Sequence, residues 1–342
     1  MTTAFEGIRF SDIVHVARGR NASDIHLAPG APAALRIDGA LGSAVGSQLE
    51  AQDVLALGRW LLGEERVARI ERGEDVSMTR HDDDGGALRV HGFRVRGGMA
   101  LSLRLLHDAV PALESLHLPD VVASLANRDR GLVIFAGPTG SGKSTSLAAV
   151  IDRINRTSAR RIITIEDPIE YRHANVKSLI LQREIGVDAP TFSQALKGAL
   201  RADPDVIMVG EMRDAETMQA ALNAAETGHL VLSTLHTGDA TQTVDRILDS
   251  FSHDAQAQVR AQLAAVLSGV VCQHLVPRAG GPGRRVVAEV LVANDAVRGL
   301  VREARTHLLR NVLSTGRRHG MQTLEHHASE LLARGAIGAD AV

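Results

Sequence analysis

The chain has 342 residues, of which 44% are hydrophobic and 23% are charged, so it can bury sizeable cores. At roughly 100–200 residues per domain, two domains are expected. The formal net charge of −2 argues against a nucleic-acid polyanion as the main target. Aromatic residues make up only 2% of the chain, so the cores must be aliphatic.

Cysteine content and apolar runs bear on the compartment. Cys272 is the single cysteine, which excludes an intrachain disulfide and a cysteine-cluster zinc site and favours a reducing compartment. The N-terminus, MTTAFEGIRFSD, lacks the apolar core of a signal peptide. The apolar run 263–272 is interrupted by Ser268 and is too short to span a bilayer. We therefore expect a cytosolic protein that does not insert into a membrane but can dock onto a membrane protein.

The first 106 residues have the pattern of a small α+β domain. Residues 51–71 have apolar side chains at helical spacing, and the run 82–86, DDDGG, is typical of a hairpin turn. Short strands are predicted at 34–38, 87–95 and 100–106. The stretch 107–130 contains Pro111, Pro119 and a polar run, and we place a linker there.

From residue 131 to residue 342 the pattern changes to short apolar runs that alternate with helical stretches. The apolar runs are LVIFAG, IITIED, DVIMVGE and HLVLSTL, and the helical stretches are 143–156, 192–202 and 215–227. This alternation predicts a parallel sheet flanked by helices. After a further strand at 286–293, the tail is expected to be helical.

A phosphate-binding loop follows the strand 132–136. Its sequence GPTGSGKS fits G-x-x-x-x-G-K-[ST] between a strand and a helix, the context that this motif requires. Glycines let backbone N–H groups converge on phosphates, Lys143 is expected to reach the β- and γ-phosphates, and Ser144 to bind Mg²⁺. The predicted nucleotide-binding residues are Gly137, Pro138, Thr139, Gly140, Ser141, Gly142, Lys143, Ser144 and Thr145.

Two downstream strands end in acids. The strand 205–210 ends at Glu211, which reads as the metal-binding acid of a Walker B strand. The strand 162–165 is followed by Pro168 and then Glu170, a candidate for activating water. Parallel strands present their carboxyl ends to the ligand at one edge of the sheet, so both acids are expected near the phosphate loop. The alternative for each acid is a solvated loop carboxylate.

Two histidines flank the apolar strand 230–235. Their separation of seven residues places His229 and His236 on opposite faces of an extended strand and roughly 23 Å apart. His236 is at the ligand end and can sense the γ-phosphate. From this spacing alone, His229 is at the opposite end and holds the sheet to a neighbouring element.

The order GPTGSGKS, TIEDPIE, LRADPDVIMVGEMRD and TGHLVLSTLHT resembles the P-loop, Asp box, Walker B and His box of the type II/type IV secretion and pilus ATPases. Within this group the chain is most similar to the type IV pilus retraction ATPases, the PilT family. The resemblance extends over nearly the whole length: residues 22–27 and 35–39 match the first domain of that family, and 320–324 match near the C-terminus. Residues 296–303 resemble a further signature of the family but depart from it, with Gly299 in place of asparagine and valine in place of two isoleucines.

The resemblance implies a RecA-like P-loop NTPase domain with a parallel sheet, preceded by a small PAS-like α+β domain. It also implies a homohexamer that uses ATP and Mg²⁺. Glu170 becomes the catalytic Asp-box glutamate, Glu211 the Walker B acid, and His229 with His236 the His-box pair. Candidate phosphate-stabilising arginines are Arg89, Arg96 and Arg104 in the first domain's strand pair, and Arg201 and Arg213 beside the Walker B strand. A guanidinium matches a triphosphate bidentately, and the alternative for each arginine is a surface salt bridge.

The implied function is a motor for pilus retraction that acts on an inner-membrane platform protein, with a paralogous accessory ATPase as a further candidate partner. One cysteine and a short N-terminal region favour retraction over the extension and export relatives. An accessory or extension role and a nucleotide-gated regulatory adaptor remain alternatives. The helix expected around 296–303 either couples the motor to retraction or is an ordinary amphipathic surface helix.

Overall fold

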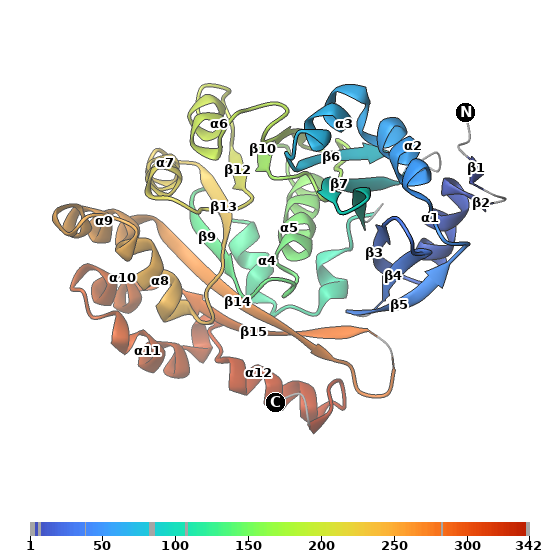
Figure 1. Ribbon diagram of the computed structural model, residues 1–342. Helices are drawn as coiled ribbons and strands as arrows, with labels where there is room; N and C mark the ends of the chain where they lie inside the picture. Colours follow the sequence, from blue (N-terminus) through green and yellow to red (C-terminus); the bar gives the residue numbers. More distant parts are fainter. Residues whose placement is uncertain are drawn as a thin grey trace. The chain divides into compact units, whose positions relative to one another are not determined.

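The computed structural model describes residues 4–5, 8–37, 39–81, 86–106, 109–281 and 283–339. The chain divides into two compact units, Met1–Ala109 and Val110–Val342, which Figure 1 draws in blue to teal and in green to red. The expected turn at 82–86 and the end of the strand 34–38 lie largely outside the described residues. In the part of the chain that is described, no helix is long and apolar enough to cross a membrane.

The first unit is built on an antiparallel sheet of six strands in the order β5-β4-β3-β8-β7-β6. Its strands are β3 (Ala22–Leu27), β4 (Ala33–Ile37), β5 (Ala40–Val45), β6 (Val76–His81), β7 (Ala87–Val95) and β8 (Gly98–Leu105), and a short pair, β1 (Ala4–Phe5) and β2 (Ile8–Arg9), precedes them. Its helices are α1 (Phe10–Gly19), α2 (Ala51–Leu62) and α3 (Glu64–Glu71). The predicted α+β character of this region is confirmed.

One helix was expected over 51–71, and the structure has two. The chain breaks between α2 and α3 at Gly63, whose φ of 84° lies in a region that other residues avoid and that ends a helix. Val54, Leu57 and Leu61 of α2 are buried together with Ile25 and Leu103 of the sheet. The helices thus supply the aliphatic core of this unit.

Most of the stretch expected to be a linker belongs instead to the second unit. Residues Leu113–Leu116 form a 3₁₀ turn and α4 covers Val121–Ala126. Leu113, Val122 and Leu125 are buried in the core of that unit. Prolines and polar residues are typical of a linker. Here, however, these three buried apolar side chains hold the segment in the core of the second unit.

The second unit has a sheet of seven strands in the order β11-β10-β12-β13-β9-β14-β15. All neighbours are parallel except β15, which runs antiparallel to β14, so the expected parallel sheet is confirmed and carries one antiparallel strand at its edge. The strands are β9 (Gly131–Ala136), β10 (Arg161–Glu166), β11 (Leu179–Glu184), β12 (Val206–Val209), β13 (Leu230–Leu235), β14 (Leu267–Pro277) and β15 (Arg284–Val292).

Helices cover both faces of this sheet. Helix α5 (Lys143–Thr157) lies against β9 and β13 from one side, and α7 (Ala215–Glu226) lies against the same strands from the other (Figure 1). The remaining helices are α6 (Phe192–Ala199), α8 (Ala240–Asp249), α9 (His253–Val266), α10 (Asp295–Arg302), α11 (Leu309–Thr315) and α12 (Leu324–Ala333). Every residue of β9, β12 and β13 is buried, as expected for strands covered on both faces.

Candidate functional site

The phosphate loop joins β9 to α5 and is shaped by close packing against β14. A Cβ atom on Gly137 would lie 2.3 Å from the carbonyl oxygen of Gln273 and 2.6 Å from Oγ of Ser141, so only glycine fits there. The side-chain amide of Gln273 donates to the Ser141 carbonyl at 2.9 Å. Gly142, with φ 89°, precedes the first residue of α5. The loop is therefore held in shape by a strand more than a hundred residues away in the sequence.

Lys143 is buried against its own loop. Its ammonium group donates to the carbonyl oxygens of Gly137 and Pro138 at 2.7 and 2.9 Å. Burial lowers the pKa of Lys143, while the negative charges of Glu211 and Glu170 act in the opposite direction. The three predicted groups thus influence one another electrostatically, which is the first sign that the structure brings them together.

Ser141, Ser144 and Thr145 differ in their surroundings. Oγ of Ser141 has no hydrogen-bond partner among the described residues, although the side chain is only 3% exposed. A buried hydroxyl without a hydrogen-bond partner, in a loop of backbone amides, fits an anionic ligand that can accept a hydrogen bond from it. Ser144 is exposed in the first turn of α5, and Oγ1 of Thr145 lies 2.9 Å from the phenolic oxygen of Tyr171.

Glu170 follows β10 on an irregular segment that begins with a cis peptide bond between Asp167 and Pro168. Its side chain is half-buried. Glu166, which the sequence reading did not select, ends β10 and is 8% exposed. Burial raises the pKa of the Glu166 carboxyl to about 7, and hydrogen bonds from Thr164 and Gln182 act against this rise. Glu166 lies within the TIEDPIE segment, but its burial depends on the strands that pack around it, and the sequence does not show that burial.

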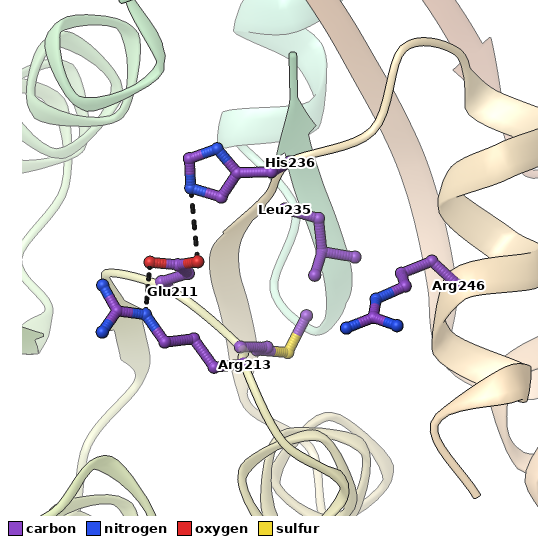
Figure 2. Close-up of a pocket in the computed structure, with 6 residues that line it drawn as sticks. Glu211, Arg213, Leu235, His236 and Arg246 are labelled. Atoms are coloured by element: carbon purple, nitrogen blue, oxygen red, sulfur yellow. Dashed lines mark hydrogen bonds and ion pairs between the residues drawn. The ribbon is translucent and has the colours of Figure 1, made fainter. Parts of the chain in front are cut away.

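Glu211 lies two residues beyond β12, with both carboxylate oxygens engaged (Figure 2). Nε of Arg213 donates to Oε2 at 2.8 Å, and Nε2 of His236 lies 3.2 Å from Oε1. The hydrogen bond to Glu211 raises the pKa of Arg213. The expected grouping of Glu211, His236 and Arg213 is therefore present at the carboxyl ends of β12 and β13.

A cavity of about 300 Å³ opens beside these groups. It is lined by Glu211, Met212, Arg213, Leu235, His236 and Arg246. Figure 2 shows Arg246 entering from α8 toward the apolar floor of the cavity. The sequence reading missed Arg246, since it sits ten residues after His236 on a helix and belongs to no recognised motif.

Two predicted residues lie away from this group. His229 stands at the amino end of β13, where Nδ1 is 2.9 Å from the carbonyl oxygen of Ala224 and 3.2 Å from Oγ1 of Thr227. Arg201 is exposed in the turn after α6, ahead of β12. Both residues are at the edge of the sheet opposite to Glu211. His229 precedes β13, whose other end carries His236, so the strand separates the two histidines. Arg201 precedes β12, whose other end leads to Glu211, so Arg201 does not line the cavity.

The first-unit arginines have different settings. Arg89 of β7 and Arg104 of β8 are direct cross-strand partners on the face opposite the core, and Arg104 donates to Asp24 at 3.0 Å. Arg96 lies in the turn between β7 and β8, which corrects its expected place in the strand pair. Arg89 and Arg104, with Asp24, thus lie on one charged face of the sheet within their own unit.

The donor set available to a metal consists of isolated oxygen ligands. In the described ranges there is no group of three or more His, Cys, Asp or Glu side chains that forms a ready metal site. The Ser144 hydroxyl and the Glu211 carboxylate are the expected ligands. One hydroxyl and one carboxylate fit Mg²⁺, which keeps several waters and takes its other ligands from phosphates.

Comparisons with known proteins agree with this geometry. A family model described as "Type II/IV secretion system protein" matches residues 8–341. The uncharacterized protein YggR of Escherichia coli K12 is 40% identical over 96% of this chain and 100% of its own length. The type IV pilus retraction ATPase PilT of Pseudomonas aeruginosa is 39% identical over 96% of this chain and 95% of its own.

Among solved structures, the pilus retraction motor PilT with bound ADP superimposes with a TM-score of 0.89 at 41% identity, covering 98% of this chain and 96% of that chain. That motor has ADP bound, so a protein of this fold binds a nucleotide. The chain belongs to the type II/IV secretion system protein family, and it is a P-loop ATPase.

Proposed function

We propose that this protein is a hexameric motor whose ATP hydrolysis powers type IV pilus retraction. The observation that carries the proposal is the convergence of Lys143, Glu170, Glu211 and His236 at the carboxyl edge of one sheet. Similarity to a retraction ATPase over nearly the whole of both chains supports the choice of system.

Binding begins with the loop from Gly137 to Thr145. Its backbone amides and the positive end of α5 attract the phosphates of ATP. Lys143 must release the carbonyl oxygens of Gly137 and Pro138 to reach the β- and γ-phosphates. The ammonium group is already desolvated, so exchanging two carbonyl partners for phosphate oxygens replaces weak acceptors with charged ones.

Hydrolysis requires a water molecule in line with the bond to the γ-phosphate. Glu170 orients this water, and Ser144 and Glu211 would hold the Mg²⁺ ion. When bound, the ion neutralises charge on the phosphate oxygens. His236 contacts Glu211 directly and so links the metal-binding acid to the end of β13. His229 and Arg201 are left out of this catalytic set, because they stand at the other edge of the sheet.

Force generation is assigned to the two units of the chain. Arg89, Arg96 and Arg104 of the first unit are the candidates for responding to the charge of the γ-phosphate, which hydrolysis removes. Repetition around a homohexamer then acts on an inner-membrane platform protein and releases pilin subunits from the fibre. In this proposal the motor is cytoplasmic and reaches the membrane through that platform protein. A paralogous accessory ATPase is a further candidate partner.

Turnover by purified variants tests the catalytic half. Lys143→Ala and Glu170→Gln are expected to lower kcat by at least a hundredfold, as removal of a phosphate clamp or a water-positioning group does. Lys177→Ala, which alters an exposed lysine of the same unit, serves as the control and should keep the wild-type rate. Near wild-type turnover of Glu170→Gln would remove Glu170 from the mechanism.

Gene deletion tests the biological half. Loss of retraction with surplus surface pili supports the proposal, whereas cells without pili indicate an extension or secretion motor. Retained retraction that weakens only under load or in a second deletion background indicates an accessory role. A well-folded hexamer without turnover, even with its membrane partner, indicates the regulatory adaptor.

A further inference from the structure

Glu170 lies on an irregular segment, so something other than regular secondary structure must hold it. The segment runs from the end of β10 at Glu166 to the start of β11 at Leu179. A water-orienting carboxylate loses much of its effect when it is displaced by about 1 Å, which can cost on the order of a hundredfold in rate. The contacts on each side of Glu170 therefore decide how well it can act.

The residue before Glu170 is held by β11. The backbone N–H of Ile169 donates to Oε2 of Glu184 at 3.2 Å. Further along the segment, the backbone N–H of His173 donates to Oε1 of Gln182 at 3.0 Å. Strand β11 thus fixes the segment by side chains that reach back from positions 182 and 184.

The residue after Glu170 is the only tyrosine of the chain and is more firmly held. Tyr171 is 5% exposed, and its carbonyl oxygen accepts from Nε2 of Gln182 at 2.8 Å. Its phenolic oxygen lies 2.9 Å from Oγ1 of Thr145. Burial raises the pKa of the Tyr171 phenol above its ordinary value, at which the hydroxyl is already protonated around neutral pH.

Thr145 connects this contact to the phosphate loop. It lies in the first turn of α5, next to Ser144 and two residues after Lys143. The hydrogen bond between Tyr171 and Thr145 therefore joins the segment that carries Glu170 to the turn that carries the phosphate-binding side chains. The two bonded residues belong to different elements and are separated by 26 positions in the sequence.

We propose that Tyr171 is a positioning residue that sets the Glu170 carboxylate in register with the phosphate loop through its hydrogen bond to Thr145. This inference rests on the proposed role of Glu170. Tyr171 itself does not contact the reacting atoms. Its hydroxyl fixes the distance between Glu170 and the γ-phosphate that the loop holds, while its ring fills the buried space beneath the segment.

The test is Tyr171→Phe, which removes one oxygen atom and keeps the buried ring. We expect kcat for ATP hydrolysis to fall by about tenfold to a hundredfold, with the KM for ATP and the affinity for ADP unchanged within about twofold. Ser178→Ala is the matched control: it removes a buried hydroxyl, just before β11, that donates to the Ser158 carbonyl at 2.7 Å. Ser178 stands at the opposite end of β11 from Glu184, which holds the residue before Glu170. This variant should lose some stability and keep kcat.

A double-mutant cycle separates positioning from a general structural effect. In single-turnover measurements, Tyr171→Phe should lower the rate in the wild-type background and have less than a twofold effect in the Glu170→Gln background. An equal effect in both backgrounds, or a wild-type kcat for Tyr171→Phe, would overturn the inference. If Glu170→Gln itself turns over normally, the proposed function fails instead, so the two failures are distinct.

Discussion

Glu211 and Arg213 form an ion pair in which Nε of Arg213 lies 2.8 Å from Oε2 of Glu211, while His236 approaches the other oxygen. The acid expected to bind Mg²⁺ is thus engaged by two cationic or potentially cationic side chains. A metal ion at Glu211 must compete with at least one of them. Because of this competition, a change at Arg213 should alter how the ATPase rate depends on the Mg²⁺ concentration.

Arg213→Gln is expected to lower the Mg²⁺ concentration needed for half-maximal ATPase activity. The guanidinium is 61% exposed, and exposed ion pairs are worth up to about 1 kcal/mol, so the shift should be roughly two- to fivefold. Titration of the ATPase rate with Mg²⁺ at saturating ATP measures it. A fall in kcat without a shift in the Mg²⁺ midpoint would show instead that Arg213 stabilises the phosphates.

Gly137→Ala should destabilise the second unit by about 3 kcal/mol, because its Cβ would overlap a backbone oxygen and the native φ of 142° disfavours other residues. Gly140→Ala is the matched control, with φ 78° and no heavy atom within 4 Å of the new Cβ. It should cost only about 1 kcal/mol. Urea unfolding of both variants measures the difference, and equal costs would contradict the close packing against Gln273.

Glu166 predicts a pH dependence of stability. The pKa of its carboxyl is about 7 in the folded chain, whereas the ordinary value is 4.5. Between pH 4.5 and pH 7 the folded state therefore keeps a proton on Glu166, and the unfolded state has lost it. Stability contributed by this group is therefore highest below pH 4.5 and declines as the pH rises to about 7, by about 3 kcal/mol.

Glu166→Gln removes this titration while keeping a polar side chain of the same size. Relative to the wild type, the variant should gain about 3 kcal/mol in unfolding free energy between pH 4.5 and pH 8. Urea unfolding at both pH values provides the comparison. A difference between the two proteins that does not change with pH would show that folding does not raise the pKa of Glu166.

Arg298 distinguishes the two interpretations of the segment 296–303. Its guanidinium donates to the carbonyl oxygens of Ala264 and Leu267 at 2.9 Å each and also to that of Ala265, so it binds the C-terminal end of α9. Arg298→Ala should cost about 2 kcal/mol of stability, as expected for hydrogen bonds from a charged donor.

Arg302 of the same helix is exposed and makes none of these contacts. Arg302→Ala should leave stability unchanged within about 0.5 kcal/mol. If Arg302→Ala abolishes retraction in cells while ATP turnover remains, the exposed part of α10 couples the motor to its partner. If only Arg298→Ala has an effect and that effect follows stability, the helix is structural.

The sequence by itself determined the chemistry that depends on neighbouring residues. The phosphate loop could be predicted because strand, glycines, lysine and helix follow one another without a gap, and α5 begins at Lys143. Glu170, Glu211 and His236 could be predicted because the carboxyl ends of parallel strands share one edge. The same reasoning from strand length put His229 at the far edge, where the structure has it, although the family pattern pairs it with His236.

Tertiary structure alone decided the features that depend on residues distant in the chain. Strand β14 could not be separated from α9 within the apolar run 263–272, because a fully buried strand has no alternation and the boundary at Leu267 depends on pairing with β9. Three features have no local signal: Gln273 beneath the phosphate loop, the burial of Glu166, and the link between Tyr171 and Thr145. Each is defined by what packs against it, and those partners come from other strands and helices.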